Sequence, residues 1–321
     1  MTTKGLSVIT VCMNRQQHLQ STAVRVAEFA HHQEHLVLDW SSREPLRRDQ
    51  LPSDSRIRVE RVEGETRWNL CRAYNVAAQL AHGDVLLKLD ADCWLEQIDL
   101  DLHLKTVSDV CWFGSGLDGR LGQFLMTRAA FEAVGGFNEL LVGYGFDDKD
   151  LKARLKSLDF AIQLLPEASI GVIPHSIHER VSRTDIKALR SSPLQDSLSF
   201  AQRRASAMSN RIAAAHSPWT FRRMGTRYVQ SKHQTLLADQ ASVPQHEPPV
   251  AKELERLRRQ VFWGEFLLIP AAVVRRLPQC LLSSDVKGFY NVKLWHKIYW
   301  LSIRQIFRFL VMPLDPGFWR F

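Results

Sequence analysis

The sequence predicts an α/β fold in which helices flank a mixed, mostly parallel sheet. Three observations predict this class. Strand-like and helix-like segments alternate over the first 90 residues, glycines close two of the predicted helices, and the apolar run Val85 to Leu89 has the composition of a buried strand. Alternation of this kind is typical of βαβ units, whose successive strands lie parallel in one sheet.

The elements of the first part follow from the spacing of apolar residues. Alternation marks a strand over residues 57–62, whereas Leu19, Ala23 and Val26 recur at helical spacing. In order along the chain, we expect a strand over 6–12, a helix over 16–32, strands over 35–40 and 57–62, a helix over 68–81 closed by Gly83, and a strand over 85–89.

The next part is richer in glycine and less regular. A strand-like run covers residues 123–126, and a short helix over 129–134 is closed by Gly135 and Gly136. A further helix over 147–158 has acidic residues in its first turn, which suits the helix dipole.

The domain boundaries are predicted from composition. We expect an α/β domain over residues 1–180, a basic helical extension over 181–238, a proline-containing linker over 239–250 and a basic, aromatic, amphipathic region over 251–321. Hydrophobic residues make up 45% of the 321 residues and charged residues 24%, as in ordinary globular proteins.

The five cysteines are scattered without a Cys-x-x-Cys pair, which favours reduced thiols over a disulfide framework or a structural zinc site. The first residues lead directly into a strand without a charged leader and a cleavable apolar stretch. No apolar run reaches the roughly 18–20 residues that span a bilayer. We therefore expect a cytoplasmic protein without a transmembrane segment.

The net charge of +8 is unevenly distributed. Residues 1–180 hold 20 Lys/Arg against 25 Asp/Glu, and residues 181–321 hold 22 against 9. This asymmetry points to an anionic partner of the C-terminal part, either a membrane surface or nucleic acid. We do not expect nucleic acid, because the aromatic residues do not share the basic face and no nucleic-acid motif is recognisable.

A membrane surface suits residues 292–312, which have the pattern of an amphipathic helix. Aromatic and aliphatic residues cover much of this helix, and four basic residues fall on one face: Lys293, Lys297, Arg304 and Arg308. Such a helix lies in a membrane interface, and the protein would then be peripheral on the inner face of the cell membrane. The alternative is a helix that packs on the catalytic core and exposes its basic face to solvent.

The strongest chemical signal is the pair Asp90 and Asp92 directly after the buried strand. Positions i and i+2 of a strand point to the same side, and two adjacent carboxylates repel each other unless a cation lies between them. Open α/β sheets bind ligands at this edge, so the pair predicts a divalent metal site. The alternative is a solvated turn.

Polar residues also follow the first two strands. Asp39 can accept hydrogen bonds from a nucleotide base or ribose, or it can cap the turn that follows it. Thr10, Asn14 and Arg15 can line a nucleotide pocket, or they can form a polar loop with a cap.

The second strong signal is the segment Gly143 to Asp150. Its glycines allow close backbone approach, Tyr144 offers a flat face to a sugar ring, and one of the carboxylates Asp147 and Asp148 can act as a general base. Helix N-terminal charge alone explains the acidic residues but not the Gly-aromatic-Gly before them.

Histidine supplies one more candidate ligand. His175 follows a short apolar strand, where a neutral imidazole can bind an ion such as Mn²⁺ or serve only a structural role. The histidines His31, His32 and His35 have no carboxylate nearby in sequence, and we expect them at the surface.

Taken in order, Thr10 with Asp39, Asp90-Ala91-Asp92, the Gly143 to Asp148 segment and His175 resemble the GT-A glycosyltransferases of family 2. The resemblance is closest to members with a galactosyltransferase-like or chondroitin-polymerase-like C-terminal half, and it covers residues 5–180. Gly135 to Glu139 also resembles the family's Gly-Gly-Phe-Asp-Glu acceptor region. The resemblance implies a Rossmann-like sheet with a nucleotide-sugar half (1–95) and an acceptor half (110–180).

The resemblance also implies roles for individual residues. The base would be Asp148, and the metal ligands of a Mn²⁺ or Mg²⁺ ion would be Asp92 and His175, with Asp90 on the metal or the ribose. The nucleotide-sugar would contact Thr10, Asn14, Arg15, Asp39, Asn69 and Arg72. The acceptor and donor sugars would contact Gln123, Tyr144 and Asp147.

The implied activity is transfer of a hexose or N-acetylhexosamine from a UDP-sugar to a glycan or lipid-linked acceptor. Departures from the family affect the sugar and the metal geometry: Tyr144 and Asp147 replace Trp and Glu, Tyr74-Asn75 replaces Arg-Asn, and Val172 replaces a methionine ligand. Two alternatives stay open, a catalytically silent glycan-binding protein and a nucleotidyltransferase on a related fold, although the latter class carries a glycine-rich basic loop that Cys12 to Arg15 lacks.

Overall fold

The computed structural model describes residues 5–116, 119–174, 206–221, 225–232 and 234–255, together with 283–284, 290–291, 302 and 306. The chain forms two units. One comprises Met1–Pro174 and Pro218–Gln245, and the other comprises His175–Ser217 and His246–Phe321. In the second unit, residues 206–216 and 248–255 are helical and the short strands β12 (Ser283–Ser284) and β13 (Tyr290–Asn291) pair antiparallel.

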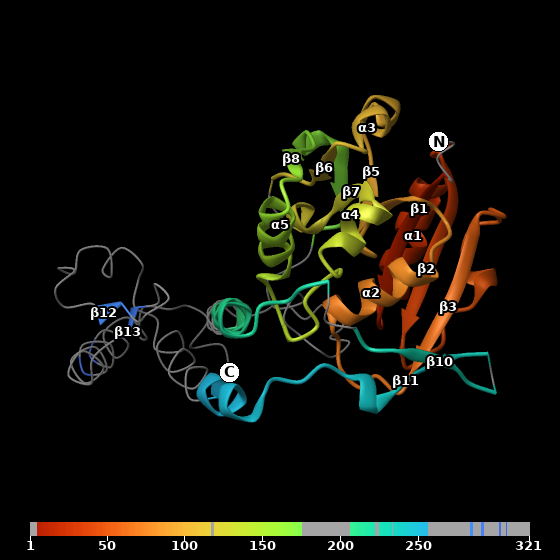
Figure 1. Ribbon diagram of the computed structural model, residues 1–321. Helices are drawn as coiled ribbons and strands as arrows, with labels where there is room; N and C mark the ends of the chain where they lie inside the picture. Colours follow the sequence, from red (N-terminus) through yellow and green to blue (C-terminus); the bar gives the residue numbers. More distant parts are fainter. Residues whose placement is uncertain are drawn as a thin grey trace. The chain divides into compact units, whose positions relative to one another are not determined.

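Within the described part of the first unit, nine strands form one sheet in the order β10-β11-β3-β2-β1-β4-β7-β6-β8 (Figure 1). The strands are β1 (Leu6–Cys12), β2 (His32–Trp40), β3 (Ile57–Glu63), β4 (Val85–Lys88), β6 (Val110–Phe113), β7 (Phe124–Thr127), β8 (Ala161–Leu164), β10 (Tyr228–Gln230) and β11 (Leu236–Ala238). Neighbouring strands are parallel in the series β11, β3, β2, β1 and β4, and β6 is parallel to β8. Strand β7 is antiparallel to both of its neighbours, β4 and β6. Strand β10 is antiparallel to β11. The predicted mixed, mostly parallel sheet is confirmed.

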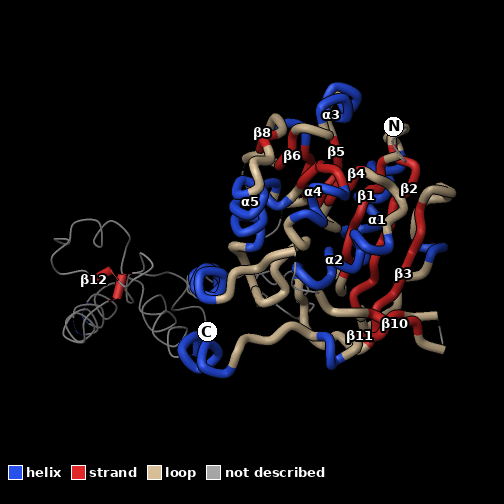
Figure 2. Tube along the Cα trace, viewed as in Figure 1, coloured by secondary structure: helices blue, strands red, loops and turns tan. Residues whose placement is uncertain are grey.

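The helices of this unit are α1 (Gln16–Ala27), α2 (Leu70–Leu80), α3 (Leu100–Thr106), α4 (Arg128–Ala133) and α5 (Asp147–Ser157). Helix α2 packs on β1 and β2, and α5 packs on β8 (Figure 2). Helix α4 packs on β7. Every residue of β1 and β4 is buried, as expected for central strands covered on both faces. A small antiparallel sheet pairs β5 (Cys93–Leu95) with β9 (Ile170–Val172), beyond the end of β4.

The segment predicted as a helical extension (181–238) contains strands. Tyr228–Gln230 and Leu236–Ala238 form β10 and β11, and β11 pairs with β3 in parallel. Alternating apolar residues over such short runs are hard to separate from a helix by periodicity, so pairing with β3 decides the outcome. The predicted amphipathic segment 292–312 lies outside the described residues, except for residues 302 and 306, which are helical.

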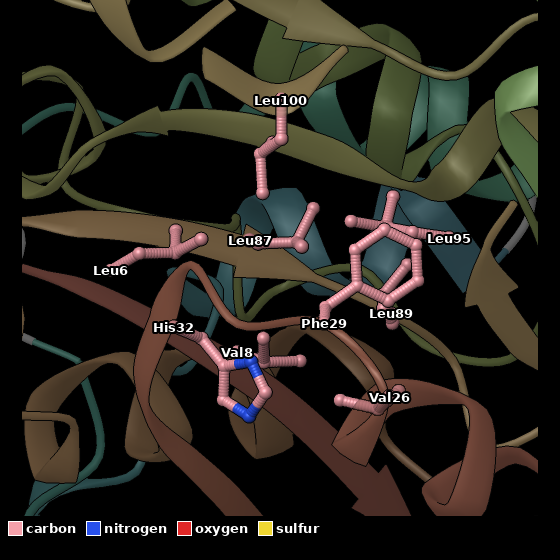
Figure 3. A pocket seen from close by; sticks show the side chains of 9 residues that line it. All are labelled: Leu6, Val8, Val26, Phe29, His32, Leu87, Leu89, Leu95 and Leu100. Atoms are coloured by element: carbon pink, nitrogen blue, oxygen red, sulfur yellow. The ribbon is translucent and has the colours of Figure 1, made fainter. Parts of the chain in front are cut away.

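Two histidines expected at the surface lie in the core. His35 is 1% exposed and its Nε2 pairs with the Thr10 hydroxyl at 3.1 Å, while His32 is 3% exposed. The imidazole of His32 lies beside Val8 and Phe29 at a cavity of about 10 Å³ (Figure 3), room for about one water molecule. The expectation was wrong because β2 begins at His32, and both faces of a central strand are covered.

The buried histidines predict a loss of stability in acid. Burial, with the positive charge of Arg56, lowers the pKa of His32 to about 4, and burial, with the neighbouring His32, lowers that of His35 to about 3. In the unfolded chain these two histidines bind protons near pH 6.5, whereas in the native chain they do not. The free energy of unfolding therefore falls as the pH drops from 6.5 towards 4. Each histidine contributes up to about 1.4 kcal/mol per pH unit.

Urea unfolding between pH 7.5 and 4.5 measures this slope, and His32→Leu should flatten it. The matched control is the exposed neighbour, as His31→Leu. Equal slopes in His32→Leu and the unmodified protein would contradict the prediction.

Candidate active site

The acidic pair lies at the end of β4, where the chain turns into β5. The Cys93 amide donates to the Asp90 carbonyl at 2.8 Å, which closes the turn. One donor atom each from Asp90, Asp92 and Cys93 lies within 4.8 Å of the other two. The turn therefore gathers two carboxylates and a thiol at the carboxyl edge of the parallel strands.

Three side chains hold the Asp90 carboxylate. Its Oδ1 accepts from the Tyr74 hydroxyl at 2.8 Å and from Lys88 Nζ at 2.7 Å, and its Oδ2 accepts from Gln123 Nε2 at 2.7 Å. Gln123 Oε1 in turn accepts from the Asp90 amide at 2.9 Å. Gln123 is fully buried and contacts Asp90, and its predicted contact with the sugars stays a prediction.

The charge of Asp90 is stabilised by its neighbours. Burial raises its pKa, but the Lys88 ammonium and the hydrogen bonds from Lys88, Gln123 and Tyr74 outweigh burial, so the pKa lies below its ordinary value. Lys88 itself is 1% exposed. Sequence reasoning missed this lysine, although a single charge in the apolar run 85–89, two residues before Asp90, was the available signal.

Asp92 is partly buried and adjoins the chain that leads to His175. The Asp92 carbonyl accepts from the Ile173 amide at 2.8 Å, because Cys93 pairs with Val172 across β5 and β9. His175, two residues beyond Ile173, lies outside the described residues.

The donor set fits a hard divalent cation such as Mn²⁺ or Mg²⁺. Carboxylate oxygens are the ligands such ions prefer. Burial and the Asp92 charge raise the pKa of the Cys93 thiol well above its ordinary value, so the thiol stays protonated and is a poor ligand. The oxygens of Asp90 and Asp92 are therefore the candidate ligands in the described residues.

The second acidic pair opens α5 after a run of left-handed backbone. Gly143 and Gly145 have φ of 80° and 85°, and Phe146, the residue before the helix, has φ of 76°. This conformation is costly for a bulky side chain, and such strain is concentrated at functional sites. The strained turn fixes the position of Asp147 and Asp148, both partly buried, and of the partly buried Tyr144.

Asp147 titrates in an unusual range. Burial and the adjacent Asp148 charge raise the pKa of Asp147 to about 6, with smaller effects of Lys88, which lowers it, and Asp90, which raises it. The charges of Lys88 and Asp90 therefore act on the first turn of α5.

We expect Asp147→Asn to stabilise the protein at neutral pH. The native state holds the Asp147 proton more tightly than the unfolded chain, so ionisation costs stability as pH rises from 3.8 to 6. With allowance for partial exposure, the gain in the free energy of unfolding above pH 6 is about 1 to 2 kcal/mol. Urea unfolding at pH 7.5 and 4.5 measures it, with the exposed Asp109→Asn as control. An equal gain at both pH values would contradict the prediction.

The residues predicted to hold the base and ribose are engaged within the protein. Asp39 is fully buried and forms an ion pair with Arg61. Its Oδ1 accepts a hydrogen bond from the Ser42 amide and its Oδ2 accepts one from the Leu46 amide, both at 3.0 Å. Asp39 thus caps the turn after β2. Thr10 is 2% exposed beside His35, and the nucleotide contacts of both residues stay predictions.

Asn14 joins the loops after β1 and β2. It has a φ of 57°, its Oδ1 accepts from the Arg43 amide at 2.8 Å, and its own amide donates to Ser42 Oγ at 2.9 Å. Arg15 is partly buried at the start of α1. These loops border the same carboxyl edge as Asp90, because β1 lies beside both β2 and β4.

Asn69 and Arg72 lie at the start of α2. Asn69 caps the helix by accepting from the Arg72 amide at 3.0 Å. Arg72 Nη2 donates to Glu65 at 2.6 Å and to the Tyr228 hydroxyl at 2.9 Å, and its guanidinium lies over the Tyr228 ring. Tyr228 also packs on Trp40. Sequence reasoning missed Tyr228 because it is 156 residues from Arg72.

Comparison with known proteins adds to this geometry. Residues 7–109 match the family model described as glycosyl transferase family 2, and residues 113–179 match the one described as N-terminal domain of galactosyltransferase. The fold and these matches define a glycosyltransferase, and therefore an enzyme. More particularly, the chain joins a family 2 segment to a galactosyltransferase-type segment, as its motifs predicted.

Three solved structures illustrate the similarity. Staphylococcus aureus TarS has 14% identity and a TM-score of 0.42, over 63% of this chain and 43% of that chain. The Pyrobaculum calidifontis mannosyltransferase PcManGT, solved with GDP-Man and Mn²⁺, has 14% identity and a TM-score of 0.46, over 95% and 86%. The catalytic domain of Drosophila β1,4-galactosyltransferase 7, solved with xylobiose, has 12% identity and a TM-score of 0.40, over 73% and 92%. No curated protein sequence matches the chain.

Proposed function

We propose that the protein transfers a hexose or an N-acetylhexosamine from a UDP-sugar to a hydroxyl of a glycan or lipid-linked saccharide, with inversion at the anomeric carbon. The proposal is supported by two acidic pairs that share one electrostatic neighbourhood, Asp90 with Asp92 and Asp147 with Asp148. The family matches, which divide between residues 109 and 113, agree with a nucleotide-sugar half and an acceptor half.

In this proposal, Asp148 accepts the proton of the acceptor hydroxyl while the hydroxyl oxygen attacks the anomeric carbon from the face opposite the diphosphate. Proton removal of this kind contributes about 10²–10⁴-fold to the rate. Asp147 holds the acceptor hydroxyl by a hydrogen bond, and the aromatic face of Tyr144 supports a sugar ring.

Asp92 and His175 would hold Mn²⁺ or Mg²⁺. The proposal for His175 is supported by the backbone hydrogen bond between Ile173 and Asp92, which brings the preceding residues of the chain to the acidic turn. When bound, the cation would neutralise the negative charge that develops on the departing UDP.

The experiment is incubation of the protein with Mn²⁺ and a panel of UDP-sugars, with GDP-mannose as an added arm, and measurement of released nucleotide. We expect release of UDP from one of the donors. Without an acceptor this release should be slow, because water then takes the place of the acceptor hydroxyl. Release of no nucleotide together with glycan binding would support the silent glycan-binding alternative instead.

We further propose that residues 251–321 contact an anionic membrane surface. Among the described residues, no helix is both long and apolar enough to span a bilayer. Support comes from the sequence of this region, where 12 Lys/Arg stand against 5 Asp/Glu among apolar and aromatic residues. Flotation with anionic liposomes, compared between the full chain and a variant that ends at residue 250, tests it; equal flotation would refute it.

A further inference from the structure

Lys88 is a fully enclosed cation at the acidic turn. Its Nζ donates to Asp90 Oδ1 at 2.7 Å and to the Gly122 carbonyl at 2.9 Å, and it lies 4.3 Å from the centre of the Tyr74 ring. The side chain is 1% exposed, so it does not reach outwards to a ligand. A buried ammonium with an ion pair, a hydrogen bond and an aromatic face is well compensated.

This arrangement occupies most of the acceptor capacity of Asp90. A carboxylate offers about four lone-pair positions. Tyr74 and Lys88 take the two on Oδ1, and Gln123 takes one on Oδ2. One position on Oδ2 is left among the described residues, and the Lys88 charge cancels that of Asp90.

In the cluster of Asp90, Asp92 and Cys93, the Lys88 ammonium therefore offsets the charge of one of the two carboxylates. Cation affinity of oxygen sites depends on the number of ligand charges. A divalent ion that reached Asp90 would also meet the Lys88 ammonium, which is held against the same carboxylate, and like charges repel. Without nucleotide, Lys88 therefore lowers the attraction of this turn for such an ion.

We propose that Lys88 is a positioning residue that occupies Asp90 and keeps the affinity of this turn for a divalent cation low until a nucleoside diphosphate adds its own negative charge. The inference rests on the proposed function in so far as it names the nucleotide. It makes cation binding and nucleotide binding interdependent, so that neither ligand alone fills the site.

A merely structural lysine gives the opposite result on removal. If Lys88 only packs in the interior and holds the Asp90 side chain in place, its loss makes the position of Asp90 less well defined and weakens cation binding. If Lys88 competes with the cation, its loss frees a second carboxylate and strengthens cation binding. The sign of the change separates the two roles.

The experiment is titration of the full-length protein with Mn²⁺, without nucleotide, with free Mn²⁺ followed by its electron paramagnetic resonance signal. Lys88→Met removes the charge and keeps the length, and because one like charge beside the ion is lost, we expect Mn²⁺ to bind about 10-fold more tightly. Adding UDP should reduce the difference between Lys88→Met and the unmodified protein. The control is Tyr74→Phe, which removes one hydrogen bond to the same Asp90 oxygen and keeps the ammonium, and should change Mn²⁺ affinity much less.

Circular dichroism verifies folding, and Lys88→Gln, which can still donate to Asp90, replaces Lys88→Met if that variant does not fold. Unchanged or weaker Mn²⁺ binding in a folded variant without the charge would overturn the proposal. Because this titration needs no donor sugar, its outcome is independent of the nucleotide-release assay, which can fail by itself if the proposed transfer reaction is wrong.

Discussion

Asp148→Asn should lower sugar transfer by about 10²–10⁴-fold and leave UDP binding nearly unchanged. The amide keeps the shape of the side chain but cannot take the proton of the acceptor hydroxyl. Asp148 is only partly buried in the first turn of α5, so the change removes a charge without opening the core. Initial rates of UDP release with acceptor, and UDP affinity by calorimetry, measure the two effects separately.

The matched control is Lys149→Ala, which alters the next, exposed residue of the same turn and should leave transfer within a few-fold. Near-full turnover of Asp148→Asn would show that the base is assigned to the wrong residue. If Asp147→Asn then lost activity to the same extent, the role of base would pass to Asp147.

Asp92→Asn should weaken metal-dependent UDP binding by at least about 100-fold. Mutation of a residue that only hydrogen-bonds to a metal-binding side chain already lowers metal affinity by about 10–100-fold. In the proposed site, Asp92 would supply one of the carboxylate ligands of the cation. The backbone contact of Asp92 with Ile173 remains in this variant, so the turn should keep its shape. UDP affinity measured with Mn²⁺ and with EDTA gives the metal-dependent part.

Glu96→Gln is the control for Asp92→Asn, because Glu96 is an exposed carboxylate just after β5. It should bind UDP and Mn²⁺ as the unmodified protein does. UDP binding that depended on Mn²⁺ equally in Asp92→Asn and Glu96→Gln would remove Asp92 from the metal site.

Strong local patterns made much of the fold predictable. The apolar runs of β1 and β4 are buried over their whole length, and the strand and helix order up to residue 89 follows directly from spacing. The ends of elements depended on neighbours instead. Helix α1 stops at Ala27 and β2 begins at His32, because pairing with β1 and β3 extends the strand through two histidines that look like surface residues in the sequence.

Site residues were predictable as motifs but less so as contacts. The two acidic pairs stand out in the sequence, yet their surroundings come from distant segments. Gln123 reaches Asp90 from 33 positions away, and Asp39 is closed in by Arg61. Such pairings depend on strand register, which no local pattern specifies.

The pairing of β11 with β3 also affects biosynthesis. The last two residues of β3, Val62 and Glu63, gain their partners only when β11 has been synthesised, long after the strand that precedes Asp90. A ribosome-bound chain, or a truncated product ending near residue 180, would leave the end of β3 at Val62 and Glu63 without this partner and open to pairing with other chains. Recombinant fragments that keep this pairing should therefore extend beyond β11, which ends at Ala238.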